Sequence, residues 1–267
     1  MTRLLAIASL VVWLTPVAAL AQDAAGQGGD LAKAAQNPVA DLISLPFQNN
    51  TSFGIGPDDR TQNLLNIQPV VPFSAGGVNL INRTIAPVLY QPDLTGSTGG
   101  VFGLGDINHT VFFSPARASR VTWGVGPGIS FPTATDSTLG TGKLSLGPSA
   151  VVLMMPGRWV VGALISNSWS VAGDSDRADV NQFLLQYFVN YNMAEGWYAV
   201  SAPIVAANWK AAGGERWVVP FGGGVGRVFR VGGQPINASA QAYYNAGKPT
   251  GGPPWSLRLQ LQLLFPK

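Results

Sequence analysis

The sequence of 267 residues contains no cysteine, and charged side chains are scarce. Asp, Glu, Lys and Arg make up 11% of the chain, less than half of the roughly 25% that is usual in soluble domains. Without cysteine there are no disulfides. With a single histidine there is also no Cys/His set at metal-binding spacing. We therefore expect neither a metal nor a cofactor.

Long apolar runs are missing beyond residue 21. No later stretch reaches about 18 consecutive apolar residues, which argues against helical membrane spans. The net charge of +3 comes from a small excess of Lys and Arg that forms no cluster, so nucleic acid is not an expected partner. A chain this poor in charge, with positive mean hydropathy and no membrane helix, fits a membrane β-barrel.

The N-terminal residues differ from the rest. Arg3 precedes the apolar stretch 4–20, and small residues at 19 and 21 match the pattern of signal-peptidase cleavage. We predict that residues 1–21 are a signal peptide; a retained spanning helix is the alternative. Residues 22–46 are predicted to form a periplasmic leader. It has a short helix at 30–35 and a second one that opens at Asn37-Pro38 and runs through Ile43. This leader is either a plug of the barrel or a loosely packed segment below it.

From Phe47 onward apolar residues recur at every second position, which is the period of a β-strand. In 255–265, Trp and Leu alternate with Ser, Arg and Gln; 180–193 and 234–246 behave similarly, with Leu184 and Phe188 as exceptions. The polar face carries Gln, Asn, Ser and Gly in place of the Lys, Glu and Asp of a soluble sheet. Such a large apolar surface exceeds what a soluble protein exposes, so we expect this face to contact lipid.

The links between the predicted strands alternate between short and long. This fits short periplasmic turns and longer outer loops, and with both chain ends periplasmic the strand number must be even. We predict an all-β fold with residues 47–267 as one antiparallel up-and-down transmembrane barrel of about twelve strands in the bacterial outer membrane. The expected strands are 47–56, 63–73, 78–90, 104–113, 121–131, 143–154, 158–170, 180–193, 196–209, 216–229, 234–246 and 255–265.

Seven tryptophans of the mature chain lie near predicted strand ends. Three follow short turns and four lie beside long loops, which predicts two aromatic girdles at the membrane interfaces; core aromatics are the alternative. The girdle residues are Trp123, Trp159, Trp169, Trp197, Trp209, Trp217 and Trp255.

Several short runs resemble a family of bacterial outer-membrane putative transporters, filed under the MetA-pathway of phenol degradation and sometimes misnamed neuromedin U. They are Pro46–Asn50, Asn66–Pro69, Gly105–Ile107, Gly126–Thr135, Trp197–Tyr198, Ser201–Ile204 and Pro220–Gly224. The resemblance covers nearly all of the mature chain. It implies a barrel and the passage of small solutes, with aromatic or apolar compounds as candidates, and it brings no catalytic residue. One departure is the C-terminus, where Pro266-Lys267 follow the aromatic residue at which barrel assembly signals generally end.

Enzymatic signals are weak. The single histidine, His109, falls on the apolar parity of its strand, whereas a lipid hydrolase would need it beside a serine such as Ser114 or Ser130. We interpret His109 as structural or interfacial and expect no enzyme. The alternating glycines at 124–128 and 222–226 lie within strands, so we interpret them as space inside a barrel and not as a phosphate loop. Asp174, Asp176 and Asp179 form a solvated acidic loop or a cation site, and their spacing does not match the EF-hand loop.

Polar residues on the inner parity are the candidate site. They comprise Arg83, Asp106, Gln186, Asn190, Gln241, Arg258, Gln260 and Gln262. A lipid-facing arginine costs roughly 2–4 kcal/mol at mid-depth, so both arginines should turn inward. An inward Arg83 brings Ile81 and Ile85 with it, which a bulge or a partly apolar lumen would explain. The arginines either line a polar pathway or pair with Asp106 to brace the wall; we favour bracing.

The expected function is passive passage of small solutes through a polar, glycine-rich lumen that is narrow or gated by the leader. The alternatives are a closed structural or surface-interaction barrel and, as a third reading, a membrane-embedded lipid hydrolase. Expected partners are outer-membrane lipids and lipopolysaccharide, the barrel-assembly machinery and the solute.

Overall fold

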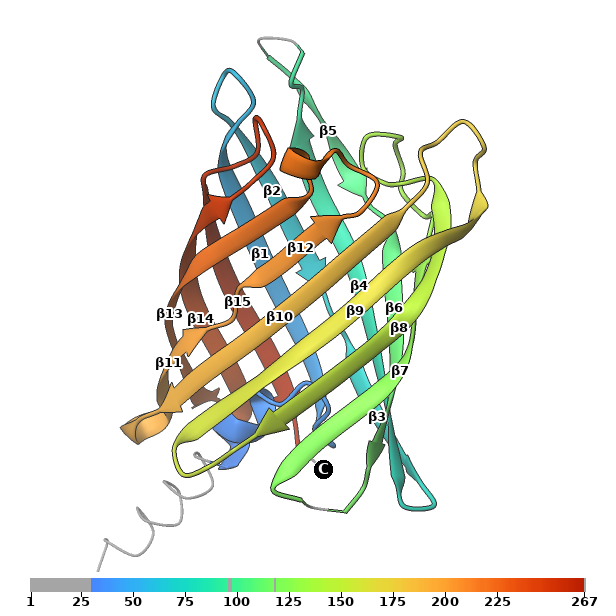
Figure 1. Cartoon of the computed structure of the whole chain (residues 1–267). Coiled ribbons are helices and arrows are strands. Elements are labelled where there is room, and N and C mark those ends of the chain that lie inside the picture. Colours follow the sequence, from blue (N-terminus) through green and yellow to red (C-terminus); the bar gives the residue numbers. More distant parts are fainter. Residues whose placement is uncertain (1–29, 96–97, 118, 267) are drawn as a thin grey trace, which may run out of the picture.

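A computed structural model describes residues 30–95, 98–117 and 119–266. The predicted signal peptide, residues 1–21, lies outside these ranges. The described chain forms a closed antiparallel barrel of twelve wall strands, as the sequence predicts (Figure 1). Neighbouring strands follow the chain order around the wall, and the first and last strands pair to close it over the register Ile43↔Phe265 to Phe53↔Trp255.

Nine wall strands are single segments and three are broken in two. The single ones are β1 (Ile43–Ile55), β4 (Val78–Pro92), β7 (Val121–Phe131), β8 (Lys143–Met154), β9 (Trp159–Gly173), β10 (Asn181–Asn192), β13 (Trp217–Val231), β14 (Gln234–Gly247) and β15 (Trp255–Phe265). The broken ones are β2 (Arg60–Ile67) with β3 (Val70–Ala75), β5 (Gly100–Leu104) with β6 (Ile107–Pro115), and β11 (Trp197–Ser201) with β12 (Ile204–Asn208).

Two of the three breaks contain a proline. Gln68-Pro69 separates β2 from β3, and Ala202-Pro203 separates β11 from β12. Proline has no backbone N–H to donate to a neighbouring strand, so the ladder is interrupted there. Opposite the second break, β13 pairs with β11 up to Gly224 and with β12 only at Trp217 and Val218.

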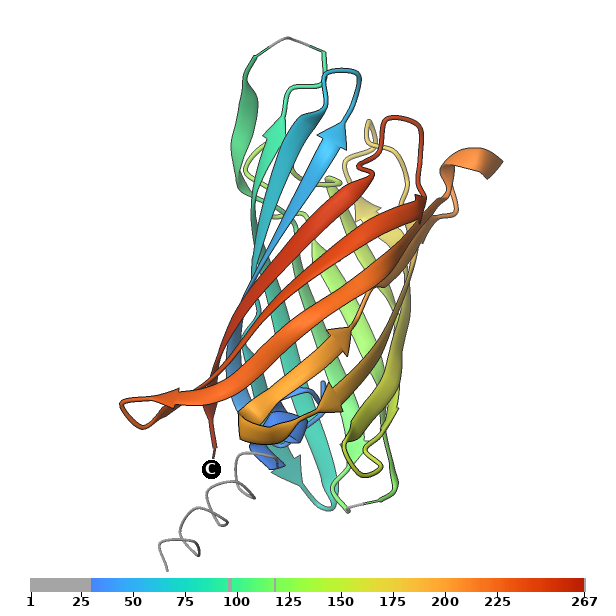
Figure 2. The same ribbon diagram turned by 90° about the vertical axis from the view of Figure 1, so that its left-hand side faces the viewer.

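The two ends of the barrel differ. At one end, called the turn end below, short turns connect the strands and the C-terminus emerges (Figures 1 and 2). At the other, called the loop end, lie the longer connections, among them 132–142 and 248–254 with the 3-10 helix η2 (Gly213–Glu215) between β12 and β13. The 3-10 helix η1 (Ala194–Gly196) is at the turn end. The turn end corresponds to the periplasmic side of known barrels.

The leader is only partly as expected. Residues 30–35 are helical, as predicted, but Asn37–Ala40 is a turn closed by the Ala40 N–H donating to the Asn37 carbonyl at 3.2 Å. The Asn37 side chain also accepts a hydrogen bond from the Val39 N–H at 3.0 Å, so this asparagine makes a turn and does not open a second helix. The strand β1 begins at Ile43, not at Phe47, because residues 43–46 pair with 262–265 of β15.

The outer face of the wall is apolar. Along β15 the exposed residues are Trp255, Leu257, Leu259, Leu261 and Phe265, while Arg258 and Gln262 are buried inside. Phe102 and Phe221 have exposed fractions of 72% and 74%. An apolar surface as large as that of the whole wall exceeds what a protein exposes to water. Hydrocarbon chains are the solvent that fits this face, so the chain is an outer-membrane β-barrel.

In the described ranges no helix has both the length and the apolar character needed to cross a bilayer.

Candidate functional site in the barrel lumen

The lumen is polar toward the loop end. A vestibule of about 440 Å³ lies there, lined by hydroxyl and amide side chains together with apolar ones such as Leu184 and Val218. Its polar lining consists of Asn108, Thr110, Ser130, Ser149, Ser166, Asn167, Ser168, Gln182 and Asn208, together with Glu215 and Arg216. Gly128 and Gly147 also line it, and because they lack side chains the wall leaves this space open.

A smaller chamber of about 160 Å³ lies next to the vestibule along the same strands. On β10, Leu184 lines the vestibule and Gln186 lines the chamber. On β9, Ser166 lines the vestibule and Leu164 lines the chamber. Since consecutive inward positions line the two cavities, the chamber lies directly below the vestibule on the path toward the turn end.

The turn end of the lumen is apolar and filled. Inward side chains from β4 to β10 form one buried cluster, and those of β11, β13 and β15 form another. The first contains Ile81, Phe112, Val151, Leu153, Val160, Leu164 and Phe188, and the second Tyr198, Val200, Val228 and Leu264. The predicted polar lumen is thus found in the vestibule and the inner chamber, whereas apolar side chains dominate nearer the turn end, where Phe188 belongs to the first cluster and Leu184 packs against it.

Residues 30–42 lie between the two clusters and are called the plug segment below (Figure 2). Val39 belongs to the first cluster; Ala32 and Leu42 belong to the second. The Gln36 amide donates to the Asn192 Oδ1 at 2.9 Å, and the Asn192 amide donates back to Gln36 Oε1 at 3.2 Å. Gly124 adds room, because a Cβ there would come within 3.2 Å of the Val39 side chain. The plug segment thus forms the floor of the inner chamber.

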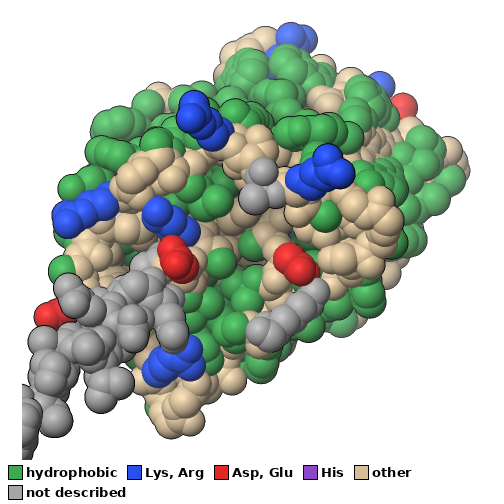
Figure 3. All heavy atoms as spheres, turned by 90° about the horizontal axis from the view of Figure 1, so that it is seen from below, with side chains coloured by type: hydrophobic (Ala, Val, Ile, Leu, Met, Phe, Trp, Pro, Cys, Tyr) green, Lys and Arg blue, Asp and Glu red, His purple; other side chains and the backbone are tan. Residues whose placement is uncertain are grey.

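Seen from below, the turn end is closed by packed side chains, with Lys and Arg around its rim (Figure 3). Exposed Arg117, Arg120, Arg158 and Arg230 come from the turns and strand ends on this side. Arg227 stacks over Trp197 at 5.2 Å and lies 4.0 Å from Glu195. Exposed pairs of this kind contribute little to stability.

Arg258 is buried, and its contacts to the described residues are all with neutral partners. Its Nε donates to Asn50 Oδ1 at 2.9 Å, its Nη1 donates to the Ala202 carbonyl at 2.8 Å, and the guanidinium stacks on Tyr243 at 5.1 Å. Ala202 precedes the Pro203 of the β11–β12 break, and its N–H donates to the Tyr243 hydroxyl at 3.1 Å. Arg258 thereby holds the interrupted strand against β15.

Arg83 lines the inner chamber, and its Nη2 donates to Gln68 Oε1 at 2.7 Å. The register of β4 with β3 and β6 is continuous through Arg83, so a partly apolar lumen, with buried Ile81 below, explains the poor alternation, and no bulge is present. Neither arginine pairs with Asp106. The expected pairing of the arginines with Asp106 was therefore wrong. Both arginines instead donate hydrogen bonds to amide or carbonyl oxygens.

Asp106 organises the loop end. It lies in the break between β5 and β6, and its carboxylate accepts hydrogen bonds from the Thr141 N–H at 2.6 Å, the Thr141 hydroxyl at 2.7 Å and the Ala134 N–H at 3.2 Å. Arg177 adds bonds to the carbonyls of Ser137 and Gly140 in the same loop. The carboxylate therefore holds the loop 132–142 against the break between β5 and β6.

The other predicted inner residues occupy separate levels of the lumen. Gln186, Gln260 and Gln262 line the inner chamber. Gln241 is buried and accepts a hydrogen bond from the Tyr243 hydroxyl at 2.5 Å. Asn190 is buried near the floor, and its Oδ1 has no partner in the part of the chain that the structure describes.

The seven tryptophans all point outward and are exposed. Trp123, Trp159 and Trp197 begin strands at the turn end. Trp169, Trp209, Trp217 and Trp255 lie toward the loop end, where Trp209 and Trp217 pack edge to face at 5.4 Å. This arrangement places aromatic rings at both ends of the apolar belt.

His109 faces away from the lumen. Its neighbours Asn108 and Thr110 line the vestibule, so His109 points to the outer side, where its Nδ1 lies 3.0 Å from Thr84 Oγ1. Ser130 lines the vestibule, and Ser114 is buried on the inner parity. The serine–histidine contact that a hydrolase of this design requires is therefore not formed by either candidate serine.

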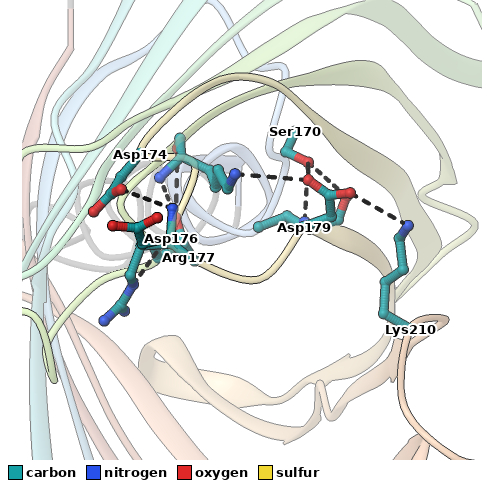
Figure 4. Close-up of polar contacts among 9 residues, drawn as sticks. Ser170, Asp174, Asp176, Arg177, Asp179 and Lys210 are labelled. Atoms are coloured by element: carbon teal, nitrogen blue, oxygen red, sulfur yellow. Dashed lines mark hydrogen bonds and ion pairs between the residues drawn. The ribbon is translucent and has the colours of Figure 1, made fainter.

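Two of the three carboxylates of the acidic loop 174–179 have partners among the described residues, one within the loop and one outside it (Figure 4). Asp174 accepts a hydrogen bond from the Asp176 N–H at 2.9 Å, and Asp179 lies 3.7 Å from both Lys143 and Lys210. Among residues whose positions are described, no His, Cys, Asp and Glu group with the geometry of a metal site occurs.

Two loop carboxyls have perturbed pKa values. Hydrogen bonds donated by the Thr250 hydroxyl and N–H lower the pKa of Glu215. The Thr138 N–H and hydroxyl likewise lower the pKa of Asp136. Glu215 thus ties η2 to the loop 248–254 at the rim of the vestibule.

Several inner residues were missed from the sequence. Tyr243 shares the parity of Gln241, so the alternation itself contained the signal. Asn50 and Gln68 lie in segments with weak alternation, and only the closure of β1 against β15 brings Asn50 to Arg258. The hydroxyl lining of the vestibule was visible only as small residues on the inner parity.

Comparison with known proteins identifies the fold. No protein-family model and no curated protein sequence matches the chain. The crystal structure of the COG4313 outer membrane channel from Pseudomonas putida F1 superposes with a TM-score of 0.63 at 14% identity, covering 84% of this chain and 94% of that one. The Salmonella typhi outer membrane phospholipase (TM-score 0.44, 13% identity, 91% and 98% covered) and the Pseudomonas putida toluene transporter TodX (0.42, 8%, 87% and 92%) are more distant. The first likeness shows the twelve-stranded barrel fold.

Proposed function

We propose that the protein is an outer-membrane channel that passes small solutes passively and is gated by the plug segment. The observation that carries this proposal is the stack of two cavities inside a closed barrel, which ends on the plug segment and not on the wall itself. A barrel that served only as a structural support would not need a hydroxyl-lined vestibule of 440 Å³ above a second, polar chamber.

Further observations support a proposal for the substrate class. The chain resembles putative transporters linked to aromatic compounds, and the structurally similar barrel from Pseudomonas putida is described as a channel. Within the lumen, polar walls alternate with apolar side chains such as Leu184 and Leu164. We therefore propose small aromatic or otherwise amphiphilic molecules as the solutes, which present both kinds of surface.

Conductance across planar lipid bilayers tests the proposal. The mature chain should give small or intermittent currents, and a chain lacking residues 22–41 should give larger and more persistent ones. Liposome swelling with sugars of increasing size would report the solute limit. Absence of both current and solute flux from either protein, when each is shown to be folded by the heat-dependent shift of its gel migration, would contradict a channel.

A further inference from the structure

The inner chamber contains a cation without an acidic partner. Its lining includes Arg83 and the amide side chains of Gln48, Gln68, Gln186, Gln260 and Gln262, and no Asp or Glu. The plug segment closes it on the side of the turn end. Asp106 was the acidic residue expected near this arginine. Its carboxylate instead accepts hydrogen bonds from Thr141 and Ala134.

Most of the hydrogen-bonding capacity of Arg83 is unused. A guanidinium has five N–H donors, and the one hydrogen bond of Arg83 to the described chain is that to Gln68 Oε1 at 2.7 Å. Gln260 also lines this chamber and makes no side-chain hydrogen bond to the residues that the structure places, so its amide is also available. The two donors thus line one small cavity, Arg83 from β4 and Gln260 from β15, with β1 and β2 between these strands in the wall.

The electrostatic setting favours an anion in that space. Arg258 is a second buried cation, linked to the chamber because it and Gln186 donate to the same Ala202 carbonyl, at 2.8 Å and 3.5 Å. A cavity with charge of one sign and low-dielectric walls concentrates ions of the opposite sign. Two buried guanidiniums without a carboxylate therefore make this level of the lumen electropositive.

We propose that the inner chamber binds the carboxylate group of a small organic acid, with Arg83 as the anchoring residue and Gln260 as a second donor. This inference deepens the proposed function by assigning a charged end to the solute. The planar fork of arginine matches the two oxygens of a carboxylate, which a lysine cannot do equally well. The volume of 160 Å³ leaves room beyond the carboxylate for a small body, since one water occupies about 30 Å³ in the liquid.

A purely structural arginine makes a different prediction. If Arg83 served only to satisfy Gln68, removal of its charge would alter stability and leave solute recognition unchanged. If it anchors a carboxylate, removal of the charge abolishes discrimination between an acid and its neutral analogue.

Calorimetric titration of the detergent-solubilised mature protein with benzoate, benzyl alcohol and benzylamine separates these cases. We expect benzoate to bind and the alcohol and the amine to bind at least tenfold more weakly. Arg83→Gln should weaken benzoate binding roughly tenfold or more, as the loss of a charge-assisted contact predicts, with no effect on the alcohol. Arg83→Lys should restore part of the affinity. Arg120→Gln, which removes the same charge from an exposed turn, is the matched control.

The wild-type comparison stands even if Arg83→Gln fails to fold. Equal binding of benzoate and benzyl alcohol, no benzoate binding at all, or an unchanged benzoate affinity in folded Arg83→Gln would each overturn the proposal. Because binding is measured without conductance, the channel and the subsite fail separately. Bilayer current without benzoate binding would contradict only the proposed carboxylate site. Benzoate binding without current or flux would contradict only the proposed channel function.

Discussion

Arg258 illustrates how a single buried side chain holds a broken strand in place. Its two hydrogen bonds, to Asn50 and to the Ala202 carbonyl, span β1, β15 and the β11–β12 break. We expect Arg258→Met to destabilise the barrel by about 2 kcal/mol, because the part-buried oxygens of Asn50 and Ala202 each lose a short hydrogen bond and keep only one of 3.5 Å. Urea-induced unfolding in lipid vesicles would measure this. Arg230→Met, at an exposed turn, is the control and should change stability by less than about 0.5 kcal/mol.

If both variants unfold at the same urea concentration, Arg258 is not a brace. The apolar replacement also removes a buried charge, which by itself can stabilise a protein. A rise in stability would therefore show that the desolvation of the guanidinium outweighs its contacts.

Gly147 shows why a glycine is needed where two strands approach closely. A Cβ at this position would collide with the carbonyl oxygen of Asn167 on β9, and the β8–β9 pairing skips residues 147 and 148. Gly147→Ala should destabilise the barrel by about 1–3 kcal/mol, the usual cost of overpacking. Gly214→Ala is the matched control, because a Cβ there meets nothing within 4 Å. Equal unfolding midpoints for the two variants would refute the close approach.

At the residue scale the sequence predicted which side chains turn inward better than it predicted their partners. Alternation alone gave Arg258, Gln260 and Gln262 an inner position. The expected contact of Arg83 with Asp106 does not form, because Asp106 lies in a strand break where backbone N–H groups of the loop 132–142 are free to bind it. Alternation carries no information about such a break, since it assumes a continuous strand.

The plug segment is an element whose position depends on apolar packing. Val39 is buried among Ile81, Phe112 and their neighbours, so a carboxylate there would be desolvated at a cost of several kcal/mol. Val39→Asp should displace the plug segment and raise the bilayer conductance toward that of the truncated chain. Val39→Ile keeps the apolar contact and should conduct as the parent does. Unchanged conductance of Val39→Asp would show that the segment does not close the lumen.

The loop contact between η2 and the loop 248–254 should depend on pH. Hydrogen bonds from Thr250 lower the folded-state pKa of Glu215, so the contact is favoured above the unfolded-state pKa and is lost as the pH falls through the lowered folded value. Spin labels on the two loops should therefore separate only in acid, below the ordinary titration range of glutamate. Thr250→Val should move this separation to higher pH. A separation that is independent of pH between neutral and strongly acidic solution would contradict the linkage.

At the scale of elements, the strands were predictable and their interruptions were not. The expected segments 121–131, 143–154 and 255–265 coincide with β7, β8 and β15, because each shows alternation over most of its length and is bounded by turn-forming residues. The start of β1 was missed since Asn37-Pro38 resembles a helix N-terminus, whereas the Asn37 side chain closes a turn. Whether Pro69 or Pro203 breaks a strand depends on whether the neighbouring strand would have accepted a hydrogen bond from the missing N–H. The sequence of a single segment does not show this.

In the whole molecule, the apolar outer face of the barrel wall contacts lipid, and the plug segment closes the lumen at the turn end. The wall follows from composition, because a chain with so few charges and so many outward apolar residues has no stable arrangement in water. The floor does not follow from composition, since residues 30–42 could have packed against any apolar surface. It is the match between Val39 and Leu42 and the two inner clusters that places the segment inside the barrel.

Gating by the plug segment requires that it move relative to the wall, and the absence of cysteine makes this directly testable. The pair Gln36→Cys and Asn192→Cys replaces side chains whose amide groups now bond each other at 2.9 Å, so a short linker joined to both thiols through reducible disulfides can tie the segment to β10. The cross-linked protein should lose the intermittent currents, and a reductant should restore them, with Gln36→Cys alone unaffected by either treatment. If the cross-linked barrel conducts as freely as the reduced one, solutes pass without displacement of this segment, and the gate must lie elsewhere in the lumen.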